Sequence, residues 1–253
     1  MTKKSASTGL KRYAMPAWWP IPVKEHVWAP RPSPGPHSLD KSMPLLIVLR
    51  DVLKLAETAR EVKYILKSGA VRVDGVVRRD YRFPVGLMDV IEIEKENLVF
   101  RALPKPDKFL DLIPIPETEK HFKLCRIENK RTVKGGHIQL NLHDGSNILV
   151  KVSDPRNPIE DIYKTFDVIK ISLPDRKILE HYRFELGNLA LVIGGKKVGK
   201  MGRIVEVKGG IMREHKVVTL DDGNERFDVG YMTVFVVGKE SPALTLGEGI
   251  HVK

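Results

Sequence analysis

The sequence predicts an α+β protein, mostly β: a two-helix plus hairpin module, then a central β domain and a small C-terminal β-barrel. Three observations predict this fold class. Helical spacing of apolar residues is confined to residues 44–67, while most of the later chain alternates apolar and polar residues between short turn sequences. Residues 1–43 are rich in proline and in basic residues, and such a segment cannot fold alone. We therefore divide the chain into an arm (1–43), a helical module (44–104), a central domain (105–186) and a C-terminal barrel (187–253).

The composition favours a polyanionic partner. The 253 residues carry a formal net charge of +11, and 42% of them are hydrophobic, as in a globular protein. This charge favours nucleic acid or an anionic membrane, and its spread over the whole chain argues against a membrane. No apolar run approaches the ~20 residues of a spanning helix. The one cysteine, Cys125, excludes an internal disulfide and a cysteine-cluster zinc site, and we expect it to be a small buried residue in a reducing, cytoplasmic setting.

The basic arm contains all three tryptophans, Trp18, Trp19 and Trp28. Two interpretations are open: the rings pack the arm onto the globular body, or they stack on unpaired bases. Packing is the favoured interpretation for the tryptophans. Phosphate contact is the favoured one for the basic residues, and the predicted RNA-binding residues of the arm are Lys3, Lys4, Lys11, Arg12 and Arg31.

The helical module should contain two short helices. Pro44 is expected to open the first, because the apolar residues that follow it form one helical face. Thr58 and Glu61 have the spacing of a capping box that starts the second helix, and Gly69 should end it. The second helix has a basic face, because residues three and four apart are neighbours on a helix, and this face comprises Arg60, Lys63 and Lys67.

A basic β-hairpin should follow, over residues 70–82 with a turn at Asp74 and Gly75. A closing strand over 90–94 should bury Ile91 and Ile93 and leave Val90, Glu92 and Glu94 in water. The helix face and the hairpin together predict a cationic surface, for which two solvated charged faces are the alternative. Its predicted RNA-binding residues are Arg50, Lys54, Arg60, Lys63, Lys67, Arg72, Arg78, Arg79 and Arg82.

We expect the middle of the chain to have a purely structural role. Prolines in residues 103–115 predict a linker. Residues 137–152 should form a hairpin around a turn at 143–146, and residues 166–184 a second one around 173–176. No catalytic pattern is present in this region, and the eight histidines of the chain are scattered without metal-ligand spacing.

In the C-terminal region, Gly194 to Lys200 fits most of a phosphate-binding P-loop. Met201 stands where such a loop needs a hydroxyl for magnesium, and a β-branched strand follows where a helix is required. We therefore exclude nucleotide hydrolysis and predict a small barrel with further strands at 216–220 and 233–237. Its glycine-rich loop is either a solvated turn or a phosphate contact. Phosphate contact is favoured, because the loop offers four cations without an acid: Lys196, Lys197, Lys200 and Arg203.

Several stretches resemble known modules. The helix pair and the hairpin at 71–75 resemble the S4 RNA-binding module, and residues 199–204 with their flanking strands resemble a KOW motif, typical of an SH3-like barrel. Nearly the whole chain is similar to the S4e family of ribosomal proteins, found in the small subunit of archaeal and eukaryotic ribosomes. This resemblance rests on residues 10–12 with the tryptophan pair, and on residues 28–37, 43–50, 84–91 and 184–188. The N-terminus differs from the family's pattern, because residues 2–7 stand where the family usually begins with Arg-Gly.

The resemblance implies a structural constituent of the small ribosomal subunit that binds folded ribosomal RNA in translation. Neighbouring ribosomal proteins are the other expected partners. No enzymatic activity, cofactor, metal or small-molecule substrate is expected. One rival is an RNA-modifying enzyme that uses the helical module for delivery, but the middle region is too short for a synthase core. The other is a transcription elongation partner acting through the KOW-type barrel.

Overall fold

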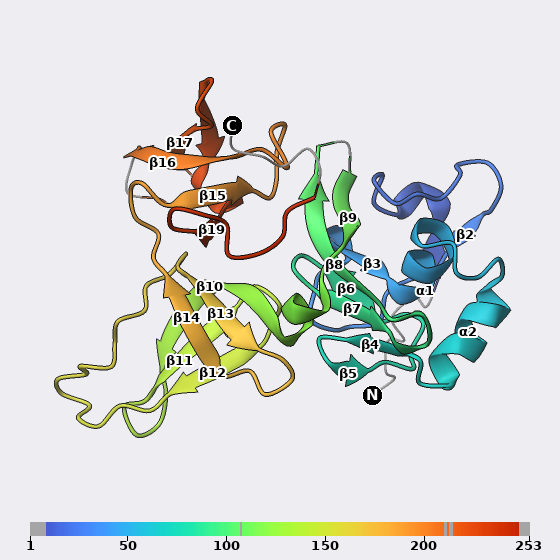
Figure 1. The fold of residues 1–253 in the computed structure, drawn as a ribbon, viewed down its shortest axis with the longest axis horizontal. Helices are drawn as coiled ribbons and strands as arrows, with labels where there is room; N and C mark the ends of the chain where they lie inside the picture. Colours follow the sequence, from blue (N-terminus) through green and yellow to red (C-terminus); the bar gives the residue numbers. More distant parts are fainter. Residues whose placement is uncertain (1–8, 107, 210–211, 213–214, 248–253) are drawn as a thin grey trace, which may run out of the picture.

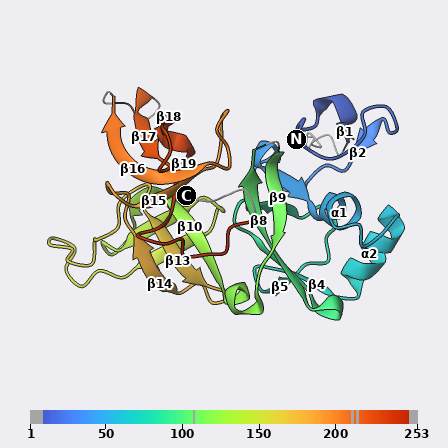
Figure 2. The same ribbon diagram turned by 45° about the horizontal axis from the view of Figure 1, so that its top comes forward.

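The computed structural model describes residues 9–106, 108–209, 212 and 215–247. The described residues are mostly β and form three five-stranded sheets, two two-stranded sheets and two short α-helices. Figures 1 and 2 show the N-terminal arm and both helices on one side of the molecule, and the central and C-terminal sheets on the other. The predicted mostly β fold with two short helices is confirmed.

The arm is fastened to the body by two of its tryptophans. Strands β1 (Leu10–Lys11) and β2 (Trp28–Ala29) pair in antiparallel fashion. Trp19 is buried and donates its indole N–H to Ser42 O at 3.0 Å, and the Trp18 ring lies 5.5 Å from that of Phe109. Packing therefore accounts for these two rings, whereas Trp28 is 61% exposed.

The first helix is shorter than expected. Pro44 ends β3 (Ser42–Pro44) and serves as the N-cap, after which α1 (Leu45–Ile47) continues as a π-helical turn over Val48–Val52. The second helix, α2 (Ala59–Lys67), starts at the predicted capping box. Thr58 Oγ1 accepts from Glu61 N at 3.3 Å, and Glu61 Oε2 accepts from Thr58 N at 3.4 Å. Gly69, with φ +80°, follows the helix end, as predicted.

The first large sheet has the strand order β5-β4-β7-β8-β9. The predicted turn joins β4 to β5, and positive φ at Asp74 (52°) and Gly75 (74°) gives it the hand that suits a two-residue hairpin. The hairpin ends sooner than expected, since residues 78–82 form a loop that leads to β6, which pairs with β3. The strands are β4 (Val71–Val73), β5 (Val76–Val77), β6 (Pro84–Gly86), β7 (Val90–Ile93), β8 (Leu98–Lys105) and β9 (Lys108–Pro114).

Two expectations about this sheet are wrong. The proposed linker at 103–115 is a hairpin, in which β8 and β9 pair in antiparallel fashion. Its prolines are tolerated because Pro104 lies at a register shift and β9 is an edge strand. Val90, assigned to a wet face, is 2% exposed, because it packs with Val99 of β8 and with Ile115 and Leu173.

The central sheet has the order β12-β11-β10-β13-β14, all antiparallel. Both predicted hairpins are present, as β11–β12 and β13–β14. The long strand β10, which joins them, was not predicted. Cys125 lies on β10 and is buried, as expected. The strands are β10 (Phe122–Thr132), β11 (Ile138–Leu142), β12 (Asn147–Val150), β13 (Val168–Ser172) and β14 (Ile178–Tyr182).

The C-terminal sheet has the order β18-β17-β16-β15-β19 and is antiparallel. The glycine-rich loop opens a strand and not a helix, in agreement with the exclusion of a P-loop. Strand β18 was not predicted, and the closed KOW-type barrel remains a prediction. The strands are β15 (Leu189–Val192), β16 (Met201–Lys208), β17 (Val217–Asp221), β18 (Arg226–Gly230) and β19 (Val234–Gly238).

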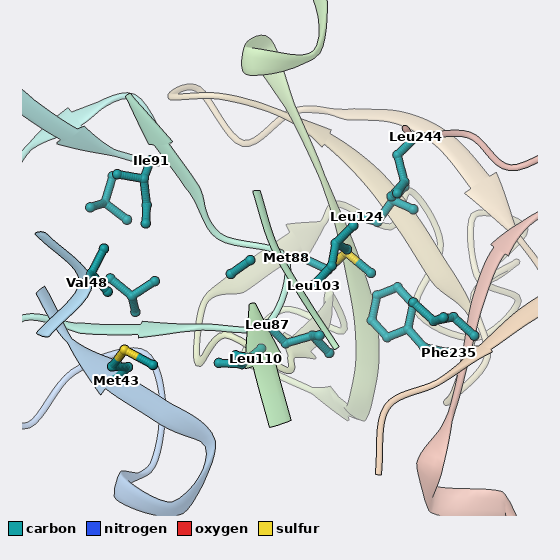
Figure 3. Close-up of a cluster of buried hydrophobic side chains, with 14 of the residues drawn as sticks. Met43, Val48, Leu87, Met88, Ile91, Leu103, Leu110, Leu124, Phe235 and Leu244 are labelled. Carbon is teal, nitrogen blue, oxygen red and sulfur yellow. The ribbon is translucent and has the colours of Figure 1, made fainter. Parts of the chain in front are cut away.

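The three sheets meet in one hydrophobic cluster, and the central sheet has a second cluster of its own. Figure 3 shows Leu103 of β8, Leu124 of β10 and Phe235 of β19 close together, with Leu244 from the segment after β19 beside them. Each of the four side chains is at most 3% exposed. Since apolar burial is the main stabilising contribution to folding, this contact should hold the sheets in one arrangement.

Candidate nucleic-acid interface

Helix α2 presents a basic face to solvent. Its apolar residues Val62 and Leu66 are fully buried, which fixes the rotation of the helix. The three predicted cations of this face, Arg60, Lys63 and Lys67, are exposed. Tyr64 stands among them with 74% of its surface exposed, and sequence reasoning did not select it. An exposed tyrosine amid cations offers a flat ring for a base beside charges for phosphates.

The loop after the hairpin joins this helix face. Lys63 Nζ lies 4.6 Å from the centre of the Tyr81 ring, and Arg82 Nε donates to Tyr81 Oη at 3.0 Å. The Arg78 guanidinium lies 4.4 Å from the centre of the Phe83 ring. Aromatic rings therefore hold these cations in place by cation–π contacts. We call the combined surface of α2 and residues 78–83 the α2-loop surface.

The other predicted cations of the module differ in their surroundings. Arg72 pairs with Glu94, which directly follows β7, and Arg50 pairs with Asp51 at 2.9 Å, so both charges are partly offset. Lys54, which has φ 54°, and Arg79 are exposed. The continuous cationic surface is thus formed by α2 and the loop, and the hairpin edge adds little to it.

A hollow of ≈ 490 Å³ lies between the arm and the module. Its wall is the proline-rich turn at 31–39, closed on one side by Arg82. Ser33 fixes this turn to the loop, since its Oγ donates to Asp80 Oδ2 at 2.9 Å and its N–H to Arg82 O at 2.9 Å. Arg31 and Arg82 both line the hollow, so it continues the α2-loop surface toward the arm.

The predicted cations of the arm proper have three different outcomes. Lys3 and Lys4 lie outside the described residues. Lys11 is exposed on β1. Arg12, which was predicted to contact RNA, is instead buried. Its Nε and Nη2 donate to Ile21 O at 3.0 and 2.5 Å. Its guanidinium satisfies backbone carbonyls inside the arm, so we leave it out of the RNA surface.

An acid from another turn offsets part of the positive charge of the glycine-rich loop. Glu225, from the β17–β18 turn, pairs with Lys200 at 2.6 Å, and this hydrogen bond raises the pKa of Lys200. Sequence reasoning did not identify this acid, because Glu225 lies 25 residues from Lys200, and phosphate contact by the loop remains a prediction. Arg203 donates to two backbone carbonyls, whereas Lys196 and Lys197 line a hollow of ≈ 260 Å³ next to the loop glycines.

The most heavily charged part of the interior was not predicted. Lys123 of β10 is 1% exposed, and its Nζ lies 2.5 Å from Asp89 Oδ1, 2.8 Å from Asp74 Oδ2 and 3.4 Å from Asp144 Oδ2. His37 of the arm binds the second Asp89 oxygen at 3.0 Å. These five residues, which we call the Lys123 cluster, join arm, module and central domain.

Charge attraction dominates the titration of Asp89, Asp144 and Lys123, whereas burial raises the pKa of Asp74. Burial alone would raise the pKa of Asp89, but His37 and Lys123 hold it well below its usual range. Burial is likewise outweighed at Asp144, where the Lys123 charge helps to lower the pKa to about 2. For Lys123 itself, attraction to Asp74 and Asp89 outweighs burial and raises the pKa far above its ordinary value. The Lys123–Asp89 ion pair is therefore present at neutral pH.

His143 lies beside the Lys123 cluster and is held neutral. Its Nδ1 accepts from Arg126 N at 3.2 Å, and its Nε2 donates to Leu87 O at 3.1 Å. Burial, reinforced by the Lys123 charge, lowers the pKa of His143 to about 3. Every member of the cluster is thus engaged in contacts inside the protein, which is the role of a structural group.

Within the described ranges, no three His, Cys, Asp or Glu side chains come close enough together to hold a metal ion. None of the helices described is both long and apolar enough to cross a membrane. The exposed cations of the α2-loop surface, together with Tyr64, form the main candidate RNA interface.

Three family models match this chain. They are described as the RS4NT (NUC023) domain over residues 6–40, the S4 domain over 43–91 and Ribosomal family S4e over 96–178. The α2-loop surface falls within the S4 match. Residues 31–39 of the hollow fall within the RS4NT match, and Arg82 falls within the S4 match.

Curated relatives cover nearly the whole chain. The small ribosomal subunit protein eS4 of Staphylothermus marinus is 49% identical over 98% of this chain and 99% of its own length. That of Aeropyrum pernix is 50% identical, again over 98% of this chain and 99% of its own length. The crystal structure of the 30S ribosomal protein S4e from Thermoplasma acidophilum is 32% identical, covers 79% of this chain and 96% of that one, and superposes with a TM-score of 0.66. The chain therefore belongs to the S4e family of ribosomal proteins.

Proposed function

We propose that this protein is a structural constituent of the small ribosomal subunit, where it binds and stabilises folded ribosomal RNA in the cytoplasm. The observation that carries the proposal is the α2-loop surface. There Lys63 and Arg82 are fixed against one ring, Tyr81, so that a helix face and a loop form one cationic surface. The relatives named as small ribosomal subunit protein eS4 support the same function.

Binding at this surface would be mainly electrostatic. Exposed lysine and arginine side chains neutralise phosphates and release counterions, so affinity should fall steeply with salt. Discrimination should come from RNA shape and from unpaired bases, because side chains cannot read the deep major groove of A-form RNA. Tyr64 is placed to stack on such a base.

The four segments would share this work. The arm (1–43) would lie along RNA and extend the contact through the hollow at 31–39, and the S4 module (44–104) would provide the main grip. The KOW-type barrel (187–253) would add a weaker contact through the hollow that Lys196 and Lys197 line. The contact would be weaker because Lys200 and Arg203 have partners within the protein, and Lys197 itself donates to Asp228 O at 3.4 Å. Neighbouring ribosomal proteins would cover part of the remaining surface. We propose no enzymatic activity, because the buried titratable groups are engaged with one another.

Sucrose-gradient sedimentation of cell extract, at moderate salt and with magnesium, tests this function. Antibody detection should place the protein with the small subunit, at constant stoichiometry and after a mild salt wash. A protein that stays at the top of the gradient would contradict the proposal. In that case an assay for modification of RNA, and a pull-down of RNA polymerase, would address the two rival functions.

A further inference from the structure

The outer face of the central sheet carries a row of amides. Asn141 of β11 is paired in register with Asn129 of β10 on one side and with Asn147 of β12 on the other. The next row along the strands consists of Arg131, Gln139 and Leu149. The two rows face solvent, since the alternate residues of β11, which include Leu140, point into the core.

The amide nitrogens of this row are available as donors. The side-chain oxygen Oδ1 of Asn141 accepts from Gln139 Nε2 at 3.0 Å, and Oδ1 of Asn129 accepts from Lys130 N at 2.8 Å. In contrast, the structure records no partner for the amide nitrogens of Asn129, Asn141 and Asn147 among the residues it describes. Each of these nitrogens has two N–H groups, so three neighbouring strands present a line of donors to the outside.

Asparagine is a poor choice for the sheet alone. It is depleted in strands, where β-branched and aromatic residues pack better on a pleated surface. Three asparagines at paired positions therefore contribute less to the sheet than threonine or valine would. A row of this kind indicates that its polar groups have a partner outside the protein.

The surrounding charge identifies the class of partner. Arg131 lies in the adjacent row, and Lys151 follows β12 two residues after Leu149. Neither forms an ion pair with another described residue, and no carboxylate lies in either row. The asparagine amides are neutral donors, and Arg131 and Lys151 lie near them as cations without an ion pair among the described residues. This combination suits a partner that has hydrogen-bond acceptors between two lines of phosphates.

We propose that the outer face of β10, β11 and β12 docks in the minor groove of an A-form RNA helix. That groove is wide and shallow, and it displays 2′-hydroxyls and base edges to a flat surface. The three amides donate to 2′-hydroxyl oxygens and to the minor-groove acceptors of the bases, while Arg131 and Lys151 pair with the flanking phosphates. The rows contain no aromatic ring for stacking, which favours a helix over an unpaired loop as the partner. This inference rests on the proposed function and adds a second RNA contact, separate from the α2-loop surface.

The test compares RNA and DNA duplexes. Fluorescence anisotropy with the full chain measures binding to a duplex of ~16 base pairs, about the length over which a protein contacts two successive minor grooves. The triple variant Asn129→Val, Asn141→Val and Asn147→Val should bind the RNA duplex at least about tenfold more weakly, because three charge-independent hydrogen bonds are lost. Its binding to the DNA duplex should change little. The melting temperature should not fall, because valine favours strands.

Two further measurements complete the test. Asn157→Val is the matched control, an exposed amide in the loop that projects from the central sheet, and it should bind like the wild type. A duplex with 2′-O-methyl groups should bind wild-type protein more weakly, and this result does not depend on any variant folding. An unchanged RNA-to-DNA ratio in the triple variant, or equal binding of the methylated duplex, would overturn the docking while leaving the ribosomal function intact. A wild-type chain that binds no RNA and does not sediment with the subunit would overturn both.

Discussion

Lys123 Nζ lies 2.5 Å from Asp89 Oδ1, and both side chains are only 1% exposed. Lys123 belongs to the central sheet, whereas Asp89 lies just before β7 in the S4 module. The other Asp89 oxygen accepts from Gly86 N at 2.8 Å and binds His37 of the arm. One carboxylate therefore joins three segments of the chain. Because burying both charges is costly, we expect the pair to specify how the segments dock more than to add net stability.

Removing one partner of this pair should be strongly destabilising. In Lys123→Met the apolar stem is retained, but Asp89, which is buried, and Asp74, which is largely buried, lose their shared cation. We expect the free energy of unfolding to fall by about 3–5 kcal/mol, the usual result of leaving a buried charge unpaired. Urea denaturation followed by circular dichroism measures this change.

Lys208→Met is the matched control for that experiment. Lys208 pairs with Glu206 at 3.1 Å, with about half of each side chain exposed. An exposed pair contributes little, so the expected loss is below about 1 kcal/mol. Equal effects of the two substitutions would show that the Lys123 cluster is not what fastens the segments.

The neutral His143 should make stability depend on pH. The unfolded chain binds a proton at this residue below about pH 6.5, the ordinary pKa, whereas in the folded protein the pKa of His143 is lowered to about 3. The unfolded state therefore binds more protons over this window, and the sign of the linkage is that stability falls as pH drops from 6.5 toward 3. Below about pH 4, Asp144 adds to the loss, because its folded pKa is lowered to about 2. Urea midpoints measured across this range should show the decline.

His143→Gln separates the contribution of the histidine. Glutamine can accept from Arg126 N or donate to Leu87 O without titrating, so the decline between pH 6.5 and 4 should be smaller than in the wild type. His121→Gln, at an exposed histidine, should keep the wild-type dependence. A His143→Gln profile that matches the wild type would place the pH dependence elsewhere.

Local features of the fold could be predicted from the sequence because neighbouring residues determine them. The capping box at Thr58 needs only Glu61, three residues away, and the Asp74-Gly75 turn needs only its own backbone conformation. The basic face of α2 followed from helical periodicity in the same way. Its aromatic supports did not, because Tyr81 reaches Lys63 only after the chain has folded back.

Features that depend on distant partners could not be predicted. Asp89 is 34 residues from Lys123, and nothing near either residue marks it as buried. Arg12 resembles the exposed arginines in sequence, yet backbone carbonyls nine residues away enclose it. The prolines of 103–115 suggested a linker, because only the pairing of β8 with β9 shows that they occupy a bulge and an edge.

The N-cap of α2 should matter to the stability of the S4 module. Thr58→Ala removes the hydroxyl that accepts from Glu61 N, so we expect a loss of about 1 kcal/mol in the free energy of unfolding. Ser68→Ala, at the other end of the helix, removes a bond to Ile65 O and leaves the N-terminal donors satisfied. Thermal unfolding of both variants distinguishes them, and a larger loss for Ser68→Ala would contradict the capping argument.

Arg126 should hold the C-terminal sheet against the central one. Its Nη1 donates to Met232 O at 2.9 Å and to Val234 O at 2.8 Å, across the boundary between the two sheets. In Arg126→Met both carbonyls lose this donor, and we expect a loss of about 1–3 kcal/mol. Hydrogen exchange should accelerate at the amides of β19. Arg226→Met, at an exposed arginine of the same C-terminal sheet, should leave exchange in β19 unchanged.

Removing the cations of the α2-loop surface should weaken RNA binding. Changing Arg60, Lys63 and Lys67 together to alanine removes three exposed cations but leaves the buried face of α2 intact, so the fold should be retained. Binding to ribosomal RNA should weaken, and the slope of log affinity against log salt should become shallower by about 2 to 3, as expected for three lost phosphate contacts. A control with the same charge change, Lys95→Ala with Lys177→Ala and Lys239→Ala, removes exposed lysines outside this surface and should alter the slope much less. Salt titrations of the three proteins decide the matter: unchanged affinity and slope in the α2 variant would exclude this face from the RNA contact.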